Sequence, residues 1–139
     1  MTPGETTLYE RLGGEAAVRR LTRRFYELMD TLPEAAACRA VHRNGLALPE
    51  QKLTDYLTGW FGGPQLYVEK YGQPMLRRRH FVASIGTEEV NGWLICFRRA
   101  VAETIPDAEA AIFMPKIEAL AQHMQNRTDE SGGVDSLQN

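Results

Sequence analysis

The sequence predicts an all-α domain with four main helices joined by short turns. Apolar residues recur every three or four positions in several stretches, as they do along one buried side of a helix. No stretch alternates apolar and polar residues for long enough to predict a strand. Glycine and proline separate the helical stretches. A chain of 139 residues has the size of one domain.

The first elements are a short helix and a long one. Thr7 and Glu10 have the spacing of a capping box, which predicts a helix that ends at Gly13-Gly14. Residues 15–30 predict a second helix that ends before Pro33. Residues 34–45 then predict a short helix and a polar loop. The apolar stripe of the long helix consists of Val18, Leu21, Phe25, Leu28 and Met29.

A third helix is expected with Pro49 in its first turn, a position that suits proline. Gly62-Gly63-Pro64 should end it. Residues 65–73 predict a loop or a weak helical turn, and Pro74 opens a short helical piece. The apolar face of the third helix consists of Leu53, Tyr56, Leu57, Trp60 and Phe61.

The last two long helices follow Gly86 and Pro106. Pro115 lies inside the final helical pattern and predicts a kink or an interrupted start, because proline lacks a backbone donor. The folded domain should span residues 1–127, followed by a disordered tail at 128–139. The buried faces consist of Val90, Trp93, Leu94, Phe97 and Val101 in one helix, and Ile112, Phe113, Ile117, Leu120, Ala121 and Met124 in the other.

Composition argues against several functional classes. Lys+Arg is 16 and Asp+Glu is 18, so the net charge is 16 − 18 = −2, which argues against a nucleic-acid partner. No apolar run has the length of a membrane span, which argues against a membrane partner. Cys38 and Cys96 lie far apart without a CxxC pair, so we expect no zinc site and a cytoplasmic location.

The stretch "PMLRRRH" at 74–80 combines three arginines with a histidine. His80 follows Leu76 by four residues and shares its helix face, which leaves open a hydrogen-bonded core histidine or a metal ligand. Trp93, thirteen residues later (93 − 80), has one N–H donor that needs a partner when buried. Tyr26 borders an apolar stripe and His42 lies in a polar loop. Each of these residues taken alone is also explained by packing or exposure.

Taken together, these residues closely resemble the truncated haemoglobins, specifically group II, the two-over-two helical globins. The resemblance covers residues 8 to about 126. The combination of GGP, LRxRH and the tryptophan thirteen residues later is specific to this group. The matching segments are "RFYELM" at 24–29, "FGGPQLYVEKYG" at 61–72, "PMLRRRHFVASIG" at 74–86, "WLICF" at 93–97 and "HMQN" at 123–126.

The resemblance implies a globin-like two-over-two helical sandwich around haem b, iron protoporphyrin IX. It implies that His80 binds the haem iron on the proximal side, and that Tyr26, His42 and Trp93 face the ligand on the distal side. The distal-histidine position of ordinary globins falls on Pro49, whose side chain cannot hydrogen-bond a ligand. The expected haem walls are Leu53, Leu57, Leu76, Phe81, Ile85 and Phe97, and the expected propionate contacts are Tyr67, Arg77 and Arg79.

The function implied by the resemblance is reversible binding of O2, and of NO and CO, by a haem globin. Several hydrogen-bond donors in one pocket suit tight ligand capture, sensing, or O2/NO redox chemistry rather than oxygen delivery. NO dioxygenation or peroxidase-like turnover would require a reductase as partner. The alternatives are a peroxidase-like haem enzyme and a haem-free helical interaction module. The chain is expected to be a monomer or a homodimer.

Overall fold

The computed structural model describes residues 6–42, 44–72 and 86–123. Across these ranges every regular element is a helix and none is a strand, so the predicted all-α class is confirmed. The four long helices are α2, α4, α7 and α8. The elements are α1 (Leu8–Leu12), α2 (Gly14–Thr31), the 3-10 turn η1 (Pro33–Ala35), α3 (Ala36–Ala40), α4 (Ala47–Trp60), α5 (Leu66–Tyr71), α7 (Thr87–Thr104) and α8 (Asp107–His123).

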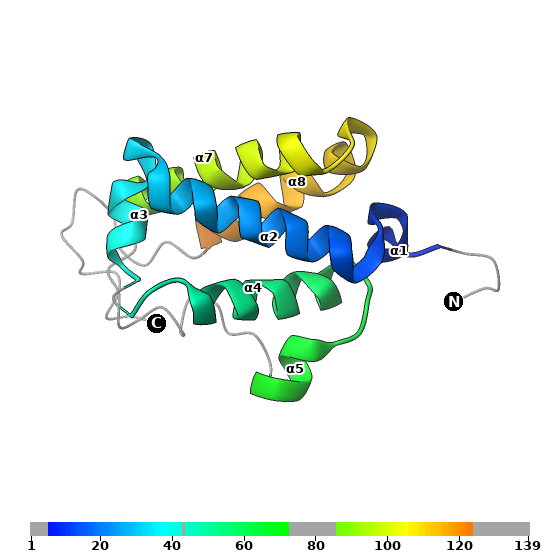
Figure 1. Ribbon diagram of the computed structural model, residues 1–139. Helices are drawn as coiled ribbons and strands as arrows, with labels where there is room; N and C mark the ends of the chain where they lie inside the picture. The colour runs from blue at the N-terminus through cyan, green and yellow to red at the C-terminus, as the bar shows by residue number, and fades with distance from the viewer. Residues whose placement is uncertain (1–5, 43, 73–85, 124–139) are drawn as a thin grey trace.

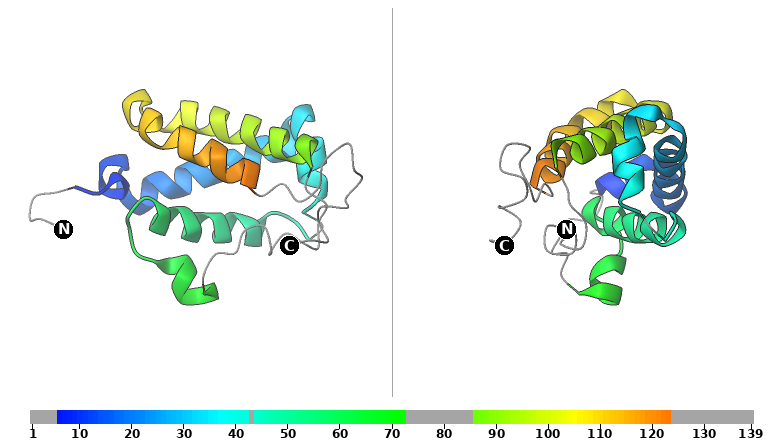
Figure 2. Two further views of the ribbon diagram at one scale, coloured as in Figure 1. Left: turned by 180° about the vertical axis from the view of Figure 1, so that it is seen from behind. Right: turned by 90° about the vertical axis from the view of Figure 1, so that its left-hand side faces the viewer.

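The long helices are arranged as two packed pairs. Helix α4 runs back along α2, and α8 runs back along α7 (Figures 1 and 2). Helix α2 also packs on α7, so it joins the two pairs, while α5 extends from the end of α4 on the side away from α2 (Figure 1). This is the two-over-two arrangement expected for a globin-like fold.

The N-terminal helix is held at both ends by local contacts. The backbone N–H of Glu10 donates to Oγ1 of Thr7 at 3.1 Å, and the backbone N–H of Thr7 donates to Oε1 of Glu10 at 3.2 Å. This reciprocal pair confirms the predicted capping box. Gly13 ends α1 in the left-handed region at φ 115°. The N–H of Tyr9 donates to the carbonyl of Phe61 at 2.8 Å, which attaches α1 to the end of α4.

The core lies between α2 and α7, as the apolar stripes predicted. All five stripe residues of α2 are buried, and Phe97, Ala100 and Val101 of α7 are buried with them. Helix α7 also approaches η1 closely at Gly92. A Cβ atom there would lie 3.1 Å from the Glu34 carbonyl oxygen and 3.2 Å from Cα of Ala35. The glycine therefore lets α7 and the η1–α3 segment pack almost backbone to backbone.

Helix α4 departs from the prediction in its buried face. It begins at Ala47, so Pro49 lies in its first turn, as predicted. Its fully buried side chains include Thr54, Asp55 and Thr58, whereas the predicted apolar residues Leu53, Tyr56 and Trp60 are only half-buried. Hydroxyl groups bond across the α2–α4 contact, where Oγ1 of Thr54 lies 2.8 Å from Oγ1 of Thr22. The apolar face of α4 therefore stays partly accessible.

Helix α8 differs from the sequence-based predictions in two respects. Ile112 was expected inside but is 44% exposed, because the buried stripe of α8 runs through Phe113, Ile117 and Ala121. The helix continues without interruption across Pro115, so the interrupted start is wrong. Pro115 and Ala111 both lie on the exposed side, where water can satisfy the carbonyl group that Pro115 leaves without a donor.

Some predictions fall on residues outside the described ranges. These are the helical piece from Pro74, the buried position of Met124 and the tail at 128–139. Among the helices that the structure describes, none combines the length and the apolar character needed to cross a bilayer.

Candidate functional site

Four aromatic rings from α2 and α7 form a cluster centred on Phe25. The Phe25 ring meets the edges of Tyr26 at 4.7 Å, Trp93 at 5.0 Å and Phe97 at 5.7 Å between ring centroids. Trp93 stacks on Phe97 at 4.9 Å with only 7° between the ring planes. Phe25 and Phe97 are fully buried, so two rigid core rings fix the orientation of the Trp93 indole.

Trp93 itself is only half-buried. Within the described part of the chain, its indole N–H makes no hydrogen bond with any residue. Because the side chain keeps some exposure, this N–H can donate to water or to a bound molecule.

Tyr26 is a buried phenol beside this ring. Its hydroxyl group donates to the Pro49 carbonyl oxygen at 3.4 Å, near the long limit for a hydrogen bond. Burial raises the pKa of Tyr26 far above its ordinary value, with smaller contributions from Cys38 and Glu50. The hydroxyl therefore stays protonated at neutral pH and remains a donor with a weakly held partner.

His42 lies next to Tyr26, two residues after the end of α3 at Ala40. The two rings meet edge to face with centroids 6.1 Å apart. Nδ1 of His42 lies 3.1 Å from the Cys38 carbonyl oxygen, and since a carbonyl only accepts, Nδ1 carries the proton. In the neutral ring Nε2 is then an acceptor, and it becomes a donor when the ring takes up a second proton.

Three elements thus bring these side chains together: Tyr26 and Trp93 both contact Phe25, and His42 contacts Tyr26. Tyr26 comes from α2, His42 from the segment after α3, and Trp93 from α7. They are separated by 16 (42 − 26) and 51 (93 − 42) positions in the sequence, so only the fold makes them neighbours.

The expected wall residues of α4 and α7 differ in accessibility. Leu53 is half-buried and packs at the edge of the core, whereas Leu57 is 1% exposed and Phe97 is 0% exposed. Leu53, Tyr56 and Trp60 together leave an apolar, partly open strip along α4. Such a strip suits a flat apolar group better than it suits water.

A buried carboxylate attaches α5 to α4 next to this strip. Asp55 is 1% exposed and accepts hydrogen bonds from Nε2 of Gln51 at 2.9 Å and from Nζ of Lys70 at 2.8 Å. The bond to Asp55 raises the pKa of Lys70, so the amine stays charged. Helix α5 carries Tyr67, whose buried ring meets Tyr56 edge to face at 5.8 Å. The Asp55–Lys70 ion pair therefore holds Tyr67 beside the strip.

Sequence reasoning missed Asp55. The available signal was a single acidic residue between Thr54 and Tyr56 in an otherwise apolar helical pattern. The remaining predicted site residues lie outside the described ranges, between the ends of α5 and α7. They are Leu76, Arg77, Arg79, His80, Phe81 and Ile85.

Comparison with known proteins places the chain in a family. The model of the bacterial-like globins matches residues 7–126. The group 2 truncated hemoglobin YjbI of Bacillus subtilis is 33% identical over 122 residues, which cover 87% of this chain and 89% of that protein. The chain belongs to the bacterial-like globin family, and its relatives are the group II truncated haemoglobins.

Solved structures agree with this assignment. The group II 2-on-2 hemoglobin from the plant pathogen Agrobacterium tumefaciens has 58% identity and a TM-score of 0.88, covering 93% of this chain and 100% of that one. The truncated oxygen-avid haemoglobin from Bacillus subtilis has 30% identity and a TM-score of 0.78, covering 87% and 100%. The predicted resemblance is therefore confirmed, and the family implies a haem cofactor and diatomic gas ligands.

Proposed function

We propose that this globin carries haem b and reversibly binds O2, as well as NO and CO, and that it holds its gas ligand tightly. The observation that carries the proposal is the cluster of Tyr26, His42 and Trp93, in which the Trp93 indole N–H has no acceptor among the described residues. Support also comes from the Bacillus subtilis relative, which is described as oxygen-avid.

The described residues fit a haem group. The partly open strip of Leu53, Tyr56 and Trp60 offers apolar surface to a flat macrocycle. Tyr26, His42 and Trp93 carry hydrogen-bond donors, which suit a small ligand that gains negative charge. When bound, haem supplies the iron that takes the gas ligand, and we assign its proximal ligand to His80.

The distal residues would act by hydrogen bonding and by excluding water. A hydrogen bond to a charged partner contributes about 1.5–3 kcal/mol, which corresponds to roughly ten- to a hundredfold slower release per good donor. Trp93 is the leading donor because its N–H has no partner among the described residues, and Tyr26 is second because it must leave the Pro49 carbonyl. His42 would donate only when its ring carries two protons.

The rim of the haem is assigned to Tyr67, Arg77 and Arg79. A guanidinium group pairs well with a carboxylate, so the two arginines suit the haem propionates. The Asp55–Lys70 pair would keep Tyr67 at the rim by holding α5 on α4. The walls are assigned to Leu53, Leu57, Leu76, Phe81, Ile85 and Phe97.

The proximal assignment is tested by His80→Ala, with His123→Ala as the matched control. His123 is exposed at the end of α8, so its loss should leave the absorption spectrum unchanged. His80→Ala should lose the haem or shift the ferrous spectrum, and exogenous imidazole should restore it. An unchanged spectrum in His80→Ala would refute the assignment, and purified wild type without a Soret band after haem supplementation would refute the haem function itself.

A further inference from the structure

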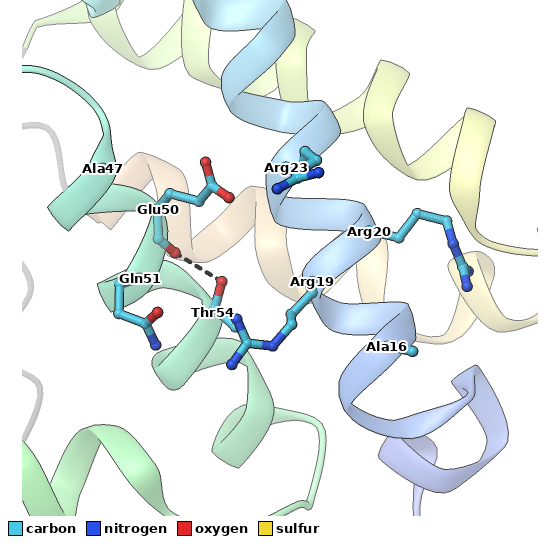
Figure 3. A pocket seen from close by; sticks show the side chains of 8 residues that line it. All are labelled: Ala16, Arg19, Arg20, Arg23, Ala47, Glu50, Gln51 and Thr54. Carbon is cyan, nitrogen blue, oxygen red and sulfur yellow. Dashed lines mark hydrogen bonds between the residues drawn. The ribbon is translucent and has the colours of Figure 1, made fainter.

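A cavity of about 550 Å³ lies between α2 and α4 (Figure 3). Its lining comes from exposed positions of α2 and from the first turns of α4. It shares Thr54 with the buried α2–α4 contact but contains none of the aromatic residues of the distal cluster. A volume in this range holds a small molecule rather than a protein segment.

The cavity is rich in positive charge although the whole chain is acidic. Arg19, Arg20 and Arg23 line one wall and Glu50 is the acidic residue on the other, so the lining has a formal charge of 3 − 1 = +2, or 2 − 1 = +1 without Arg20. In Figure 3, Arg19 extends toward Thr54 and Arg23 toward Glu50, while Arg20 points away from α4. Two guanidinium groups thus reach into the space between the helices.

The three arginines make few ion pairs or hydrogen bonds with other described residues. Within the described ranges, Arg20 and Arg23 make no ion pair or hydrogen bond. Arg19 pairs with Glu15 at 2.9 Å, but both side chains are more than half exposed, and such surface pairs contribute little to stability. An incoming anion can therefore replace Glu15 on Arg19 and occupy Arg23 at little cost. Planar guanidinium groups bind phosphate and carboxylate oxygens in pairs.

The two helices that form the cavity, α2 and α4, also carry the two partners of the Tyr26 hydrogen bond, although neither partner lines the cavity. Arg23 precedes Tyr26 by three residues on α2, and Glu50 directly follows Pro49, whose carbonyl accepts from Tyr26. That bond is 3.4 Å long, so a small change in the spacing of α2 and α4 would make or break it. An anion that draws the two helices together would thus change how available the Tyr26 hydroxyl is.

We propose that the α2–α4 cavity binds a small oxyanion with two or more negative charges, a phosphate ester or a dicarboxylate, and that this anion acts on the Tyr26 hydroxyl. Binding needs only the described arginines. The action on Tyr26 rests on the proposed function, because it is read out as a change in gas-ligand release.

Binding is tested by titration calorimetry of the haem-containing protein at low ionic strength, with inorganic pyrophosphate and, separately, with succinate. We expect one saturable site, and the tighter of the two probes identifies the phosphate or the carboxylate class. Arg19→Ala/Arg23→Ala should weaken binding by about tenfold or more, since two charge-assisted contacts are lost.

The matched control is Arg98→Ala/Arg99→Ala, which removes the same charge from exposed positions of α7. It should change the affinity by no more than about twofold, because screening limits distant charges. Absence of heat with both probes, or equal loss in the two double variants, would overturn the proposal. The second outcome would mean that net charge alone attracts the anion.

The action on Tyr26 is tested by the rate of O2 release with and without saturating pyrophosphate. The rate should change by at least about twofold in the wild type, and stay constant in Arg19→Ala/Arg23→Ala and in Tyr26→Phe. An unchanged wild-type rate would refute the proposed action of the anion on Tyr26. If the protein did not bind haem, calorimetry would still measure anion binding. Failure of the proposed haem function can therefore be told apart from failure of anion binding.

Discussion

The polar groups of Trp93, Tyr26 and His42 differ in how many of their hydrogen bonds are already made within the protein. The Trp93 indole N–H has no partner among the described residues, whereas the Tyr26 hydroxyl holds a long bond to Pro49. His42 uses its Nδ1 proton on the Cys38 carbonyl. Because a donor that is already paired must give up its partner first, Trp93 should contribute most to holding a ligand.

Trp93→Phe should speed O2 release by roughly ten- to a hundredfold, since it removes a donor that has no acceptor among the described residues but keeps an aromatic ring. Stopped-flow displacement by CO measures this rate. Val101→Ala is the control, because Val101 is buried in the same helix and loses side-chain volume outside the assigned haem and ligand residues. Equal acceleration in both variants would show that packing, rather than the indole N–H, sets the rate.

The buried thiols predict a loss of stability in alkali. Burial raises the pKa of Cys38 to about 12 and that of Cys96 to about 11, with smaller contributions from neighbouring acidic groups. Their ordinary value is 9.0, so above that pH the unfolded chain loses thiol protons that the folded chain retains. The free energy of unfolding should therefore fall with rising pH, by up to about 1.4 kcal/mol per pH unit for each thiol.

Urea unfolding between neutral pH and pH values above 9 checks this slope. Cys38→Ala/Cys96→Ala should flatten it, because the variant has no thiol proton to lose, whatever its stability at neutral pH. Tyr26, whose pKa burial also raises, should leave a residual fall above about pH 10 in the variant. A slope that is the same with and without the thiols would contradict the assignment.

At the scale of elements, α4 is the helix on which the site depends. Its polar residues Thr54 and Asp55 are buried against α2 and α5, so its apolar residues are left for the partly open strip. The end of α4 is equally constrained. Gly62 has φ 99°, and a Cβ on Gly63 would lie 2.8 Å from the Tyr9 ring and 2.9 Å from the Thr58 carbonyl oxygen. The two glycines of the GGP motif thus let α1 close over the end of α4.

Gly63→Ala should lower the free energy of unfolding by about 1–3 kcal/mol, because neither the Thr58 backbone nor the Tyr9 ring can move freely. Gly45→Ala is the control, since its Cβ would meet nothing within 4 Å and only its left-handed φ of 90° is strained. That strain should cost about 1 kcal/mol. Thermal unfolding of both variants measures the difference, and a smaller effect at Gly63 would contradict the steric explanation.

At the scale of the whole molecule, the interface between α2 and α7 is fully packed, whereas one face of α4 is left partly exposed. The contact of α2 with α7 buries the large rings, whereas the strip on α4 keeps half-buried apolar side chains. In a globin, haem would cover this strip. The fold should therefore be most dependent on its cofactor in α4 and α5, and least dependent in α2 and α7.

Removal of haem should lower overall stability, by about 4 kcal/mol if haem is present at a thousand times its dissociation constant. Hydrogen exchange of the haem-free protein should show lost protection in α4 and α5, with protection retained in α2 and α7. Uniform loss over all helices would contradict this division of the fold. Reconstitution with haem should restore the original exchange pattern.

Most of the helical framework could be predicted because its signals are local. The Thr7–Glu10 box, the stripe of α2 and the glycines after α1 and α4 act over a few residues, and the structure bears each of them out. The wrong predictions concern burial, which depends on packing against other helices. Ile112 is as apolar as Phe113, but Phe113 packs on Trp60 and Phe61 at the end of α4, whereas Ile112 stays exposed. The acidic residue between Thr54 and Tyr56 is visible in the sequence, but its burial depends on Gln51 and on Lys70 of α5.

The sequence by itself therefore determined the four long helices, the capping box of α1 and, through its motifs, the family. The tertiary structure decided which polar groups meet. It placed Tyr26 and Trp93 on Phe25 and His42 on Tyr26, left the Trp93 N–H without a described acceptor, and set Nδ1 of His42 on the Cys38 carbonyl. The reason is physical: helix propensity and apolar spacing act within a few residues, whereas hydrogen-bond partners and burial depend on segments far apart in the chain.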